Sequence, residues 1–273
     1  MISRRLLLCG LAAFSMSPTT FAGTQPKIIV GTSLIADIVK DLLADNVELL
    51  TLVQSSTCPV HSDIKVSDVV FTSRSQLALI HSFQKNLPQL QSLLKAAANP
   101  SLKTQPIVTK GNWVCPPVQK EASKAVASIL IAQYPHDKQA ILHRLETRLN
   151  RIDNAWTESK ATLKALQGVP VIAAYRQADF LQWAGLNVVT HYGQVEDLSP
   201  QTIINVVKTA KQTGVVGIVD NQQSGANIGL TIAKELKVKH VVLSNFPIEN
   251  SSQSDYFSLY RSNLKTLSSL LNR

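Results

Sequence analysis

The sequence contains few cysteine and aromatic residues for a chain of 273 residues. Its three cysteines are too few for a scaffold held together by disulfides. Aromatic residues make up only 5%, and no run of basic residues is longer than Arg4-Arg5, although the formal net charge is +9. The chain therefore lacks both the base-stacking platform and the basic stripe of a nucleic-acid-binding protein, and we expect no nucleic-acid partner.

The sequence also lacks the motifs of the common enzyme classes. It has no nucleophile elbow, no zinc-protease motif, no phosphate-binding P-loop and no glycine-rich dinucleotide motif after its first expected strand. Cys58 stands three residues before His61, which is not a protease signature, and no carboxylate pair for acid–base work can be identified. We predict that the protein is not an enzyme.

The first segment of the chain, residues 1–22, has the pattern of an export signal. Arg4-Arg5 precede an apolar stretch that ends near Met16, and the small residues Thr20 and Ala22 suit a signal-peptidase site before Gly23. The apolar stretch is shorter than the roughly 20 residues that span a bilayer. We expect cleavage and a periplasmic protein; the general secretory and twin-arginine routes both fit the paired arginines.

Short apolar runs alternate with helical patterns through most of the remaining chain, which favours an α/β fold with parallel sheets. Hydrophobic residues make up 45% of the sequence, which is ample for a core. The expected strands are Lys27–Thr32, Val47–Val53, Leu77–Ile80, Pro106–Thr109, Val169–Ala174, Asn187–His191, Val215–Asp220 and His240–Leu243. Ser33 is the expected N-cap of the first helix.

Residues 137–167 show a different pattern, with apolar residues three or four apart and no glycine or proline. This spacing predicts one helix of about 30 residues, which is on the order of 45 Å long. The expected organisation is a βα lobe over residues 23–136, the long connecting helix over 137–167 and a second βα lobe over 168–273. A ligand cleft is expected between the two lobes.

Ligands of open parallel sheets bind beyond the carboxyl ends of the strands. Several metal-binding or polar side chains follow expected strands in this sequence. Those that suit a metal ion are Cys58, His61, His81, Cys115 and Asp220. His81 also suits a capping or supporting role, and Asp220 a helix-capping role.

Cys58 and Cys115 allow three interpretations. Both follow strands of the first lobe, and two nearby thiols in an oxidising compartment usually form a disulfide. Such a bond would close a loop of about 58 residues and contribute roughly 4 kcal/mol to stability. The alternatives are metal-binding thiolates and two free thiols.

The mature chain resembles the metal-binding class of ABC-transporter solute-binding proteins, which capture zinc or manganese outside the cytoplasmic membrane. The resemblance rests on KIIVGTSLIADIVKDLLADNVELLTLV, on the loop TCPVHSDIKVSD, on the long central helix and on the closing segment YFSLYRSNLKTLSSLL. It implies two βα lobes, a metal cargo between them and an ABC permease as the partner. The segments GNWVCPP, FLQWAGLNVV, VVGIVDNQQSG and VVLSNFP indicate a less common branch.

The resemblance implies that His61 is the first metal ligand, but the other three ligand positions have changed. The second, a histidine shortly before a tryptophan, falls near Trp113, where Asn112 stands. The third falls near Tyr175 or Arg176, and the fourth, an aspartate, near Asn245. A neutral tyrosine is a poor zinc ligand and an arginine repels a cation. A metal would then need a substitute set drawn from the five residues named above.

Two functions follow from this comparison. In the first, the protein is an exported solute-binding protein, expected as a monomer, that captures a divalent cation of the zinc or manganese class for an ABC importer. In the second, it is a degenerate relative that binds a small organic molecule or a metal chelate, or acts as an interaction module. Trp113, Tyr175, Arg176, Gln177 and Asn245 would then line the site, because an arginine with amides suits a carboxylate better than a bare cation.

Overall fold

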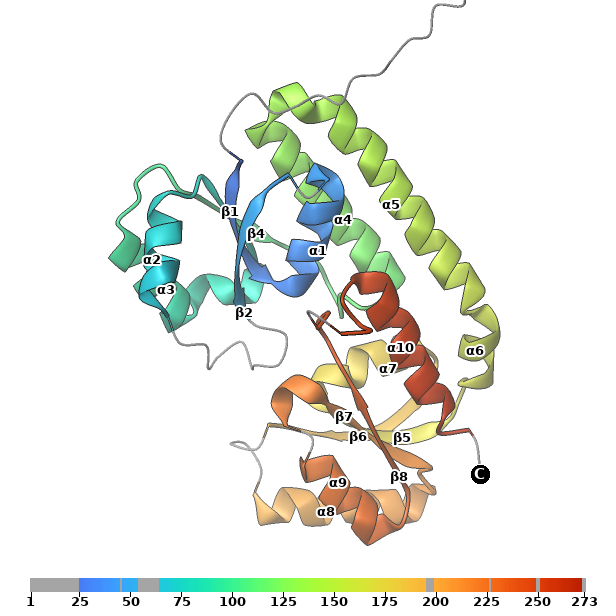
Figure 1. The fold of residues 1–273 in the computed structure, drawn as a ribbon. Helices are drawn as coiled ribbons and strands as arrows, with labels where there is room; N and C mark the ends of the chain where they lie inside the picture. The colour runs from blue at the N-terminus through green and yellow to red at the C-terminus, as the bar shows by residue number, and fades with distance from the viewer. Residues whose placement is uncertain are drawn as a thin grey trace, which may run out of the picture.

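A computed structural model describes residues 25–44, 46–53, 64–194, 199–225, 227–248 and 251–271. The expected export signal and the loop with Cys58 and His61 lie outside these residues. The described part forms two α/β lobes placed end to end (Figure 1), which confirms the predicted fold class. None of the described helices combines the length and the hydropathy needed to cross a membrane.

Each lobe contains a parallel four-stranded sheet. In the N-terminal lobe the strands β1 (Lys27–Thr32), β2 (Glu48–Val53), β3 (Leu77–His81) and β4 (Lys103–Ile107) lie in the order β2-β1-β3-β4. In the C-terminal lobe β5 (Pro170–Ala174), β6 (Asn187–Tyr192), β7 (Gly217–Asn221) and β8 (Lys239–Leu243) lie in the order β6-β5-β7-β8. Both sheets therefore have the same strand order. In each sheet the order in which the strands are added reverses between the two central strands, β1 and β3 or β5 and β7.

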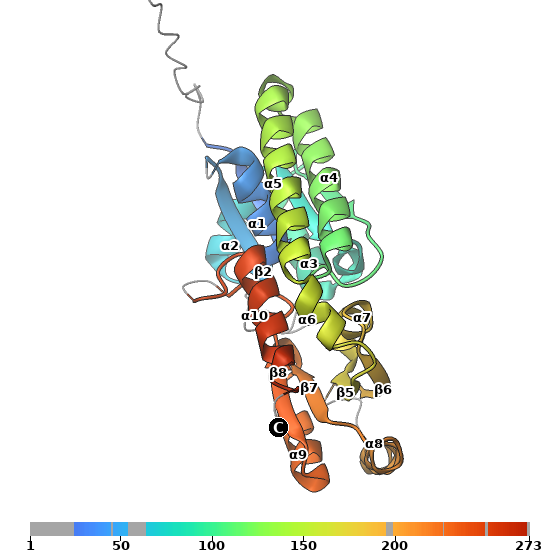
Figure 2. The same ribbon diagram turned by 90° about the vertical axis from the view of Figure 1, so that its right-hand side faces the viewer.

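The helices of the N-terminal lobe are α1 (Ser33–Leu43), α2 (Val66–Ser73), α3 (Pro88–Ala97), α4 (Pro116–Gln133) and α5 (Lys138–Glu158), with the 3₁₀ helices η1 (Ser82–Asn86) and η2 (Pro135–Asp137). The helices after α5 in the chain are α6 (Lys160–Ala165), η3 (Tyr175–Gln177), α7 (Ala178–Trp183), α8 (Pro200–Thr213), η5 (Gln222–Ser224), α9 (Asn227–Leu236) and α10 (Tyr256–Ser268). Figure 2 shows α4 and α5 side by side along the N-terminal lobe, with α6 leading to the C-terminal lobe.

Local sequence signals explain where several of these elements begin and end. The hydroxyl of Ser199 accepts a hydrogen bond of 3.1 Å from the Thr202 amide at the start of α8, and Pro200 takes the first helical position. Gly214, with φ of 65°, ends the same helix in the left-handed conformation. These local signals account for both boundaries of α8.

Three sequence expectations need correction. The expected 137–167 helix is interrupted at Ser159, whose hydroxyl donates to the Trp156 carbonyl oxygen at 2.7 Å and so competes with helical bonding. The strand expected at Pro106–Thr109 is Lys103–Ile107; Pro106 is tolerated there because β4 is an edge strand. Thr32, rather than Ser33, is the N-cap of α1, and the Ser33 hydroxyl donates to the Pro247 carbonyl oxygen at 2.9 Å.

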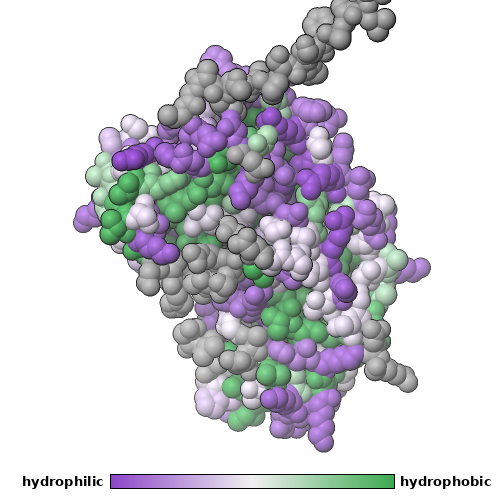
Figure 3. Space-filling model, viewed as in Figure 1, coloured by the Kyte–Doolittle hydropathy of each residue, from purple (hydrophilic) through white to green (hydrophobic). Residues whose placement is uncertain are grey.

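One hydrophobic core runs through both lobes. It includes β1 and α1 of the first lobe, β5 and α7 of the second, and the buried residues of α10. A second, smaller core lies under α8 and α9. The face in Figure 3 is mainly hydrophilic over the outer side of α5, which agrees with the single buried stripe of that helix. The shared core joins the lobes into one packed unit.

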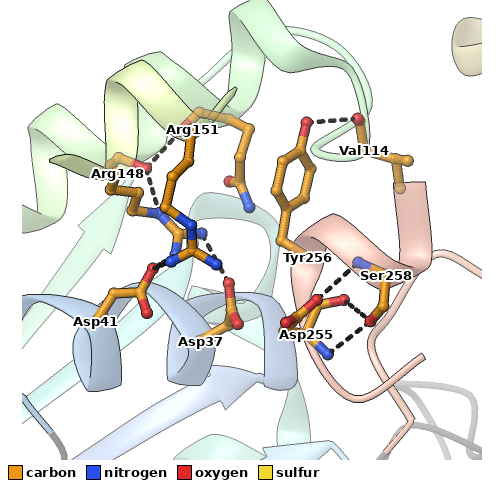
Figure 4. Close-up of polar contacts among 10 residues, drawn as sticks. Asp37, Asp41, Val114, Arg148, Arg151, Asp255, Tyr256 and Ser258 are labelled. Carbon is orange, nitrogen blue, oxygen red and sulfur yellow. Dashed lines mark hydrogen bonds and ion pairs between the residues drawn. The ribbon is translucent and has the colours of Figure 1, made fainter. Parts of the chain in front are cut away.

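Helix α10 also joins the N-terminal lobe through a buried arginine (Figure 4). Arg148 of α5 is 1% exposed, donates to Asp37 at 2.7 Å and forms an ion pair with Asp41. Burial disfavours the charged guanidinium, but the two carboxylates outweigh it and raise the pKa of Arg148. The rings of Tyr256 and Phe257 from α10 lie 6.0 and 5.6 Å from the guanidinium. The charged cluster thus has an aromatic cover supplied by the last helix.

Candidate functional site

The carboxyl ends of the four central strands face one another across the junction of the lobes. In each sheet this is the point at which the strand order reverses, where open α/β sheets bind their ligands. On the N-terminal side β1 ends at Thr32 and β3 at His81. On the C-terminal side β5 is followed by Tyr175, and β7 ends at Asn221. The candidate site is built on these four ends.

His81 forms the centre of the N-terminal wall. Its Nε2 atom lies 2.8 Å from the hydroxyl oxygen of Thr32, and its main-chain amide donates to Gln84 Oε1 at 2.9 Å. The ring packs edge-on against Trp113, with 4.1 Å between centroids. Burial lowers the pKa of His81 to about 3, so the imidazole is neutral at ordinary pH.

The C-terminal wall consists mainly of amide side chains. Gln177 Nε2 donates to Asn221 Oδ1 at 3.0 Å, and Asn221 Nδ2 donates to the Ser224 hydroxyl oxygen at 2.7 Å. The main-chain amide of Asn245 donates to Gln223 Oε1 at 3.0 Å. These bonds orient neutral donors and acceptors beside the carboxyl ends of β5 and β7.

Asn112 connects this wall to the N-terminal lobe. Its Nδ2 atom donates to Asn245 Oδ1 at 2.9 Å and to the Arg176 carbonyl oxygen at 3.3 Å. Asn245 Nδ2 in turn donates to Asn221 Oδ1 at 3.0 Å. We call Asn112, Asn221 and Asn245 the amide bridge, because they form one hydrogen-bonded chain across the seam between the lobes.

A cavity of about 400 Å³ lies between these walls. This volume is within the range of small-molecule sites and is far larger than one ion needs. Aromatic rings of both lobes line it, together with the amide bridge and two charged side chains, Arg176 and Asp179. The cavity thus combines apolar walls with a small number of directed polar groups.

The described residues do not include a ready metal-binding cluster. Over the described ranges, no three histidine, cysteine, aspartate or glutamate side chains come together as a set that could hold an ion. The cavity does offer the neutral imidazole of His81 and the carboxylate of Asp179, together with amide oxygens, which are weaker ligands for a zinc-class ion. A strong metal site at this cavity would need further ligands.

The structure brings together five of the side chains singled out in the sequence. His81, Trp113, Tyr175, Arg176 and Asn245 all line the cavity. Gln177 is fully buried and contacts the cavity only through its hydrogen bond to Asn221. Cys58 and His61 lie outside the described residues, so their part in a metal site stays a prediction.

Asp220 does not face the cavity, contrary to the expectation that it lies on the cleft side. Its carboxylate is 1% exposed, accepts a hydrogen bond from the Tyr192 hydroxyl and lies 2.7 Å from Nε2 of His240. Gly229 of α9 allows this arrangement, because a side chain there would collide with Asp220 and Tyr192. Asp220 therefore supports the packing of α9 on the sheet.

Cys115 is buried at the start of α4 and forms no disulfide with any of the residues that the structure describes. Burial raises the pKa of its thiol to about 12, so the thiolate that a metal requires is disfavoured at neutral pH. Cys115 does not line the cavity. Because Cys58 lies outside the described residues, the disulfide between Cys58 and Cys115 stays a hypothesis.

Several parts of this site were not predicted from the sequence, among them Asn112, Asp179, Asn221 and Gln223. Successive side chains of a strand point to opposite faces, and this rule could have favoured Asn221 over Asp220. Asp220 shares a face with Ile218, which packs in the small core under α8 and α9. No comparable local signal identifies Asn112, because its role depends on a partner 133 residues away.

Comparison with known proteins agrees with this architecture. Residues 28–270 match the model of the family described as ZnuA, zinc-uptake complex component A, periplasmic. The zinc-binding protein AdcA of Streptococcus pyogenes serotype M3 is 27% identical over 168 residues, or 57% of this chain. The match spans only 32% of that relative's length.

Solved structures with the same fold include one described as the crystal structure of ZnuA, with a TM-score of 0.75 and 18% identity. The Mn-bound and Cd-bound forms of a periplasmic metal-binding protein from Candidatus Liberibacter asiaticus give TM-scores of 0.75 and 0.76 at 12% and 14% identity. Each of these matches covers 89% of this chain and 98% of the other. At such identities they establish the fold. Since the family model covers nearly the whole described chain, this protein belongs to the ZnuA family of periplasmic zinc-uptake components.

Proposed function

We propose that this chain is the exported solute-binding component of an ABC importer and that its cargo contains a divalent metal of the zinc or manganese class. The family match carries this proposal, because it covers residues 28–270 and names a periplasmic uptake component. A relative described as zinc-binding and similar folds described as Mn-bound and Cd-bound support the same class of cargo. We propose no catalytic role, since the family is described by uptake rather than by a reaction.

This role suits the expected division of the chain into a signal over 1–22, a lobe over 23–136, a connector over 137–167 and a lobe over 168–273. The shared core limits how far the lobes can move, so we expect only a small closure on binding. Cargo would enter the cavity of about 400 Å³ at the facing carboxyl ends of the sheets. A capture protein needs an equilibrium site with an entry path, which this cavity provides.

The metal-binding part of the proposal depends on His61. Over the described residues the cavity supplies His81, Asp179 and amide oxygens but no cluster of three strong ligands. We propose that His61, with Cys58 as a further candidate, supplies the nitrogen and sulfur donors that a zinc-class ion prefers. Asp220 and Cys115 are left out of this set because their side chains do not line the cavity.

Isothermal titration of metal-stripped mature protein with ZnCl₂ and with MnCl₂ tests this part. We expect His61→Ala to weaken binding at least about tenfold, which corresponds to 1.4 kcal/mol. His143→Ala is the matched control, because His143 is exposed on the outer face of α5. Absence of binding by either metal, or equal binding by the two variants, would contradict a site at His61.

The transport role needs a separate measurement. Cells that lack the gene should accumulate less radiolabelled zinc or manganese than wild-type cells when the external metal is scarce. Restoring the full-length gene should restore uptake, whereas a gene without codons 2–22 should not, because its product would remain in the cytoplasm. Unchanged uptake in the deletion strain would argue against the importer role.

A further inference from the structure

Two side chains of opposite charge line the cavity, and the function proposed above does not use them. Arg176 belongs to η3 and Asp179 to the first turn of α7, three residues later, and both are exposed. Within the described ranges neither forms an ion pair with another residue. The remaining lining side chains are neutral, since burial holds His81 unprotonated.

This pair of charges limits the kind of molecule that the cavity can hold. A guanidinium binds a carboxylate through two parallel hydrogen bonds, whereas it repels a bare cation. The carboxylate of Asp179 attracts an ammonium group and disfavours a ligand with several negative charges. Together they suit a molecule that carries one carboxylate and one ammonium group close together.

The rest of the lining suits the organic part of such a molecule. The cavity is lined by Phe83 and Trp113 from the N-terminal lobe and by Tyr175 and Phe246 from the C-terminal lobe. Phe83 and Tyr175 are 56% and 58% exposed, so their rings are accessible to a ligand in the cavity. The amide bridge adds neutral donors and acceptors that can bind a polar ring or an amide.

From these contacts we infer that the cavity binds an α-amino acid with a planar side chain, either free or as the chelator of the metal. The carboxylate lies against Arg176, the amino group near Asp179 and the side chain between the aromatic rings. This inference rests on the proposed function, because it names the organic part of the cargo. It also accounts for a cavity of about 400 Å³ whose described lining is rich in aromatic and amide side chains.

Titration of the metal-stripped mature protein with L-histidine, histamine and imidazolepropionate tests the inference. Histamine lacks the carboxylate and imidazolepropionate lacks the amino group. We expect L-histidine to bind at least tenfold more tightly than either analogue. Arg176→Gln should abolish the preference over histamine, and Asp179→Asn the preference over imidazolepropionate. Arg261→Gln is the matched control, because Arg261 pairs with Glu158 on an exposed face and does not line the cavity.

A second set of titrations uses zinc chloride alone and a mixture of zinc and L-histidine. It shows whether the amino acid binds free or as a zinc chelate. Tighter binding of the mixture than of L-histidine indicates the chelate, and equal binding indicates the free amino acid. The inference is overturned if neither L-histidine nor the mixture binds, or if Arg176→Gln binds both as wild type does. If zinc chloride alone still binds and this binding depends on His61, the proposed function is supported although the inference is wrong.

Discussion

The carboxamide of Asn112 donates to the side-chain oxygen of Asn245 over 2.9 Å and so joins the two lobes of the protein. Asn112 precedes α4 of the first lobe, and Asn245 follows β8 of the second. Both side chains line the cavity, so the same bond that fixes the seam also shapes the site. A small change at either residue should therefore affect stability and ligand binding together.

We expect the amide bridge to contribute measurable coupling between the lobes. Asn112→Ala removes the donor to Asn245 Oδ1 and the acceptor of the Val114 amide, so the variant should lose about 1–2 kcal/mol of unfolding free energy. The double variant with Asn245→Ala should lose less than the sum of the single variants, with a coupling of about 0.5–1.5 kcal/mol. Urea denaturation of the four proteins measures this, and strict additivity would show that the bond contributes nothing.

The Arg148 cluster predicts a larger effect on stability. Arg148→Met leaves Asp37 buried without its partner, and we expect a loss of about 3–5 kcal/mol. Adding Asp37→Asn should recover part of that loss, because it removes the uncompensated charge. Arg151→Met is the control, since Arg151 is exposed and its ion pair among the described residues, with Asp41 at 3.3 Å, lies at the surface. A loss below 1 kcal/mol for Arg148→Met, measured by urea denaturation, would contradict this assignment.

His81 predicts a specific dependence of stability on pH. Its pKa is about 3 in the folded protein and near 6.5 in the unfolded chain, so the unfolded chain binds more protons between these values. The contribution of neutral His81 is therefore complete above pH 6.5 and is lost as the pH falls towards 3, by at most about 1.4 kcal/mol per pH unit. His81→Asn should flatten the pH profile of unfolding in this window. His143→Asn, on the exposed face of α5, should leave it unchanged.

Asp220 should be a structural residue and not a metal ligand. Asp220→Asn keeps the shape of the side chain but replaces one of the two oxygens that contact Tyr192 and His240 by an NH₂ group, so we expect a loss of about 1–3 kcal/mol of stability. Its zinc affinity should equal that of wild type once the protein is folded. Thermal unfolding and zinc titration measure the two effects. Weaker zinc binding at unchanged stability would restore Asp220 as a candidate ligand.

The sequence predicted the strands well because β-branched and aliphatic runs are their main local signal. β1 has the predicted bounds and β5 differs by one residue, since both are buried on two faces and are bounded by turn residues. Helix α4 was not predicted, although Pro116-Pro117 mark its start, because its apolar residues do not form a simple stripe. The helix expected over 137–167 corresponds to α5 and α6, and only the break between them at Ser159 was not predicted.

The site was harder to predict because its members depend on contacts between distant segments. His81 and Tyr175 could be selected from their positions after strands, which is a local property. To choose between Asp220 and Asn221, one must know which face of β7 each side chain points to. To predict the amide bridge, one must know that residues 112 and 245 are hydrogen-bonded. Residue type identified which side chains can bind a ligand, whereas the arrangement of the lobes determined which of them do.

The return of α10 towards the first lobe has a consequence for the order in which the chain folds. The hydroxyl of Tyr256 donates to the Val114 carbonyl oxygen at 3.2 Å, and the ring of Phe257 covers the guanidinium of Arg151 at 4.0 Å. A growing polypeptide cannot complete its first half until residue 257 has been synthesised. Chains that end before α10 would leave Arg148 and Arg151 without the ring of Phe257, and the face of α5 that receives α10 would be open to solvent.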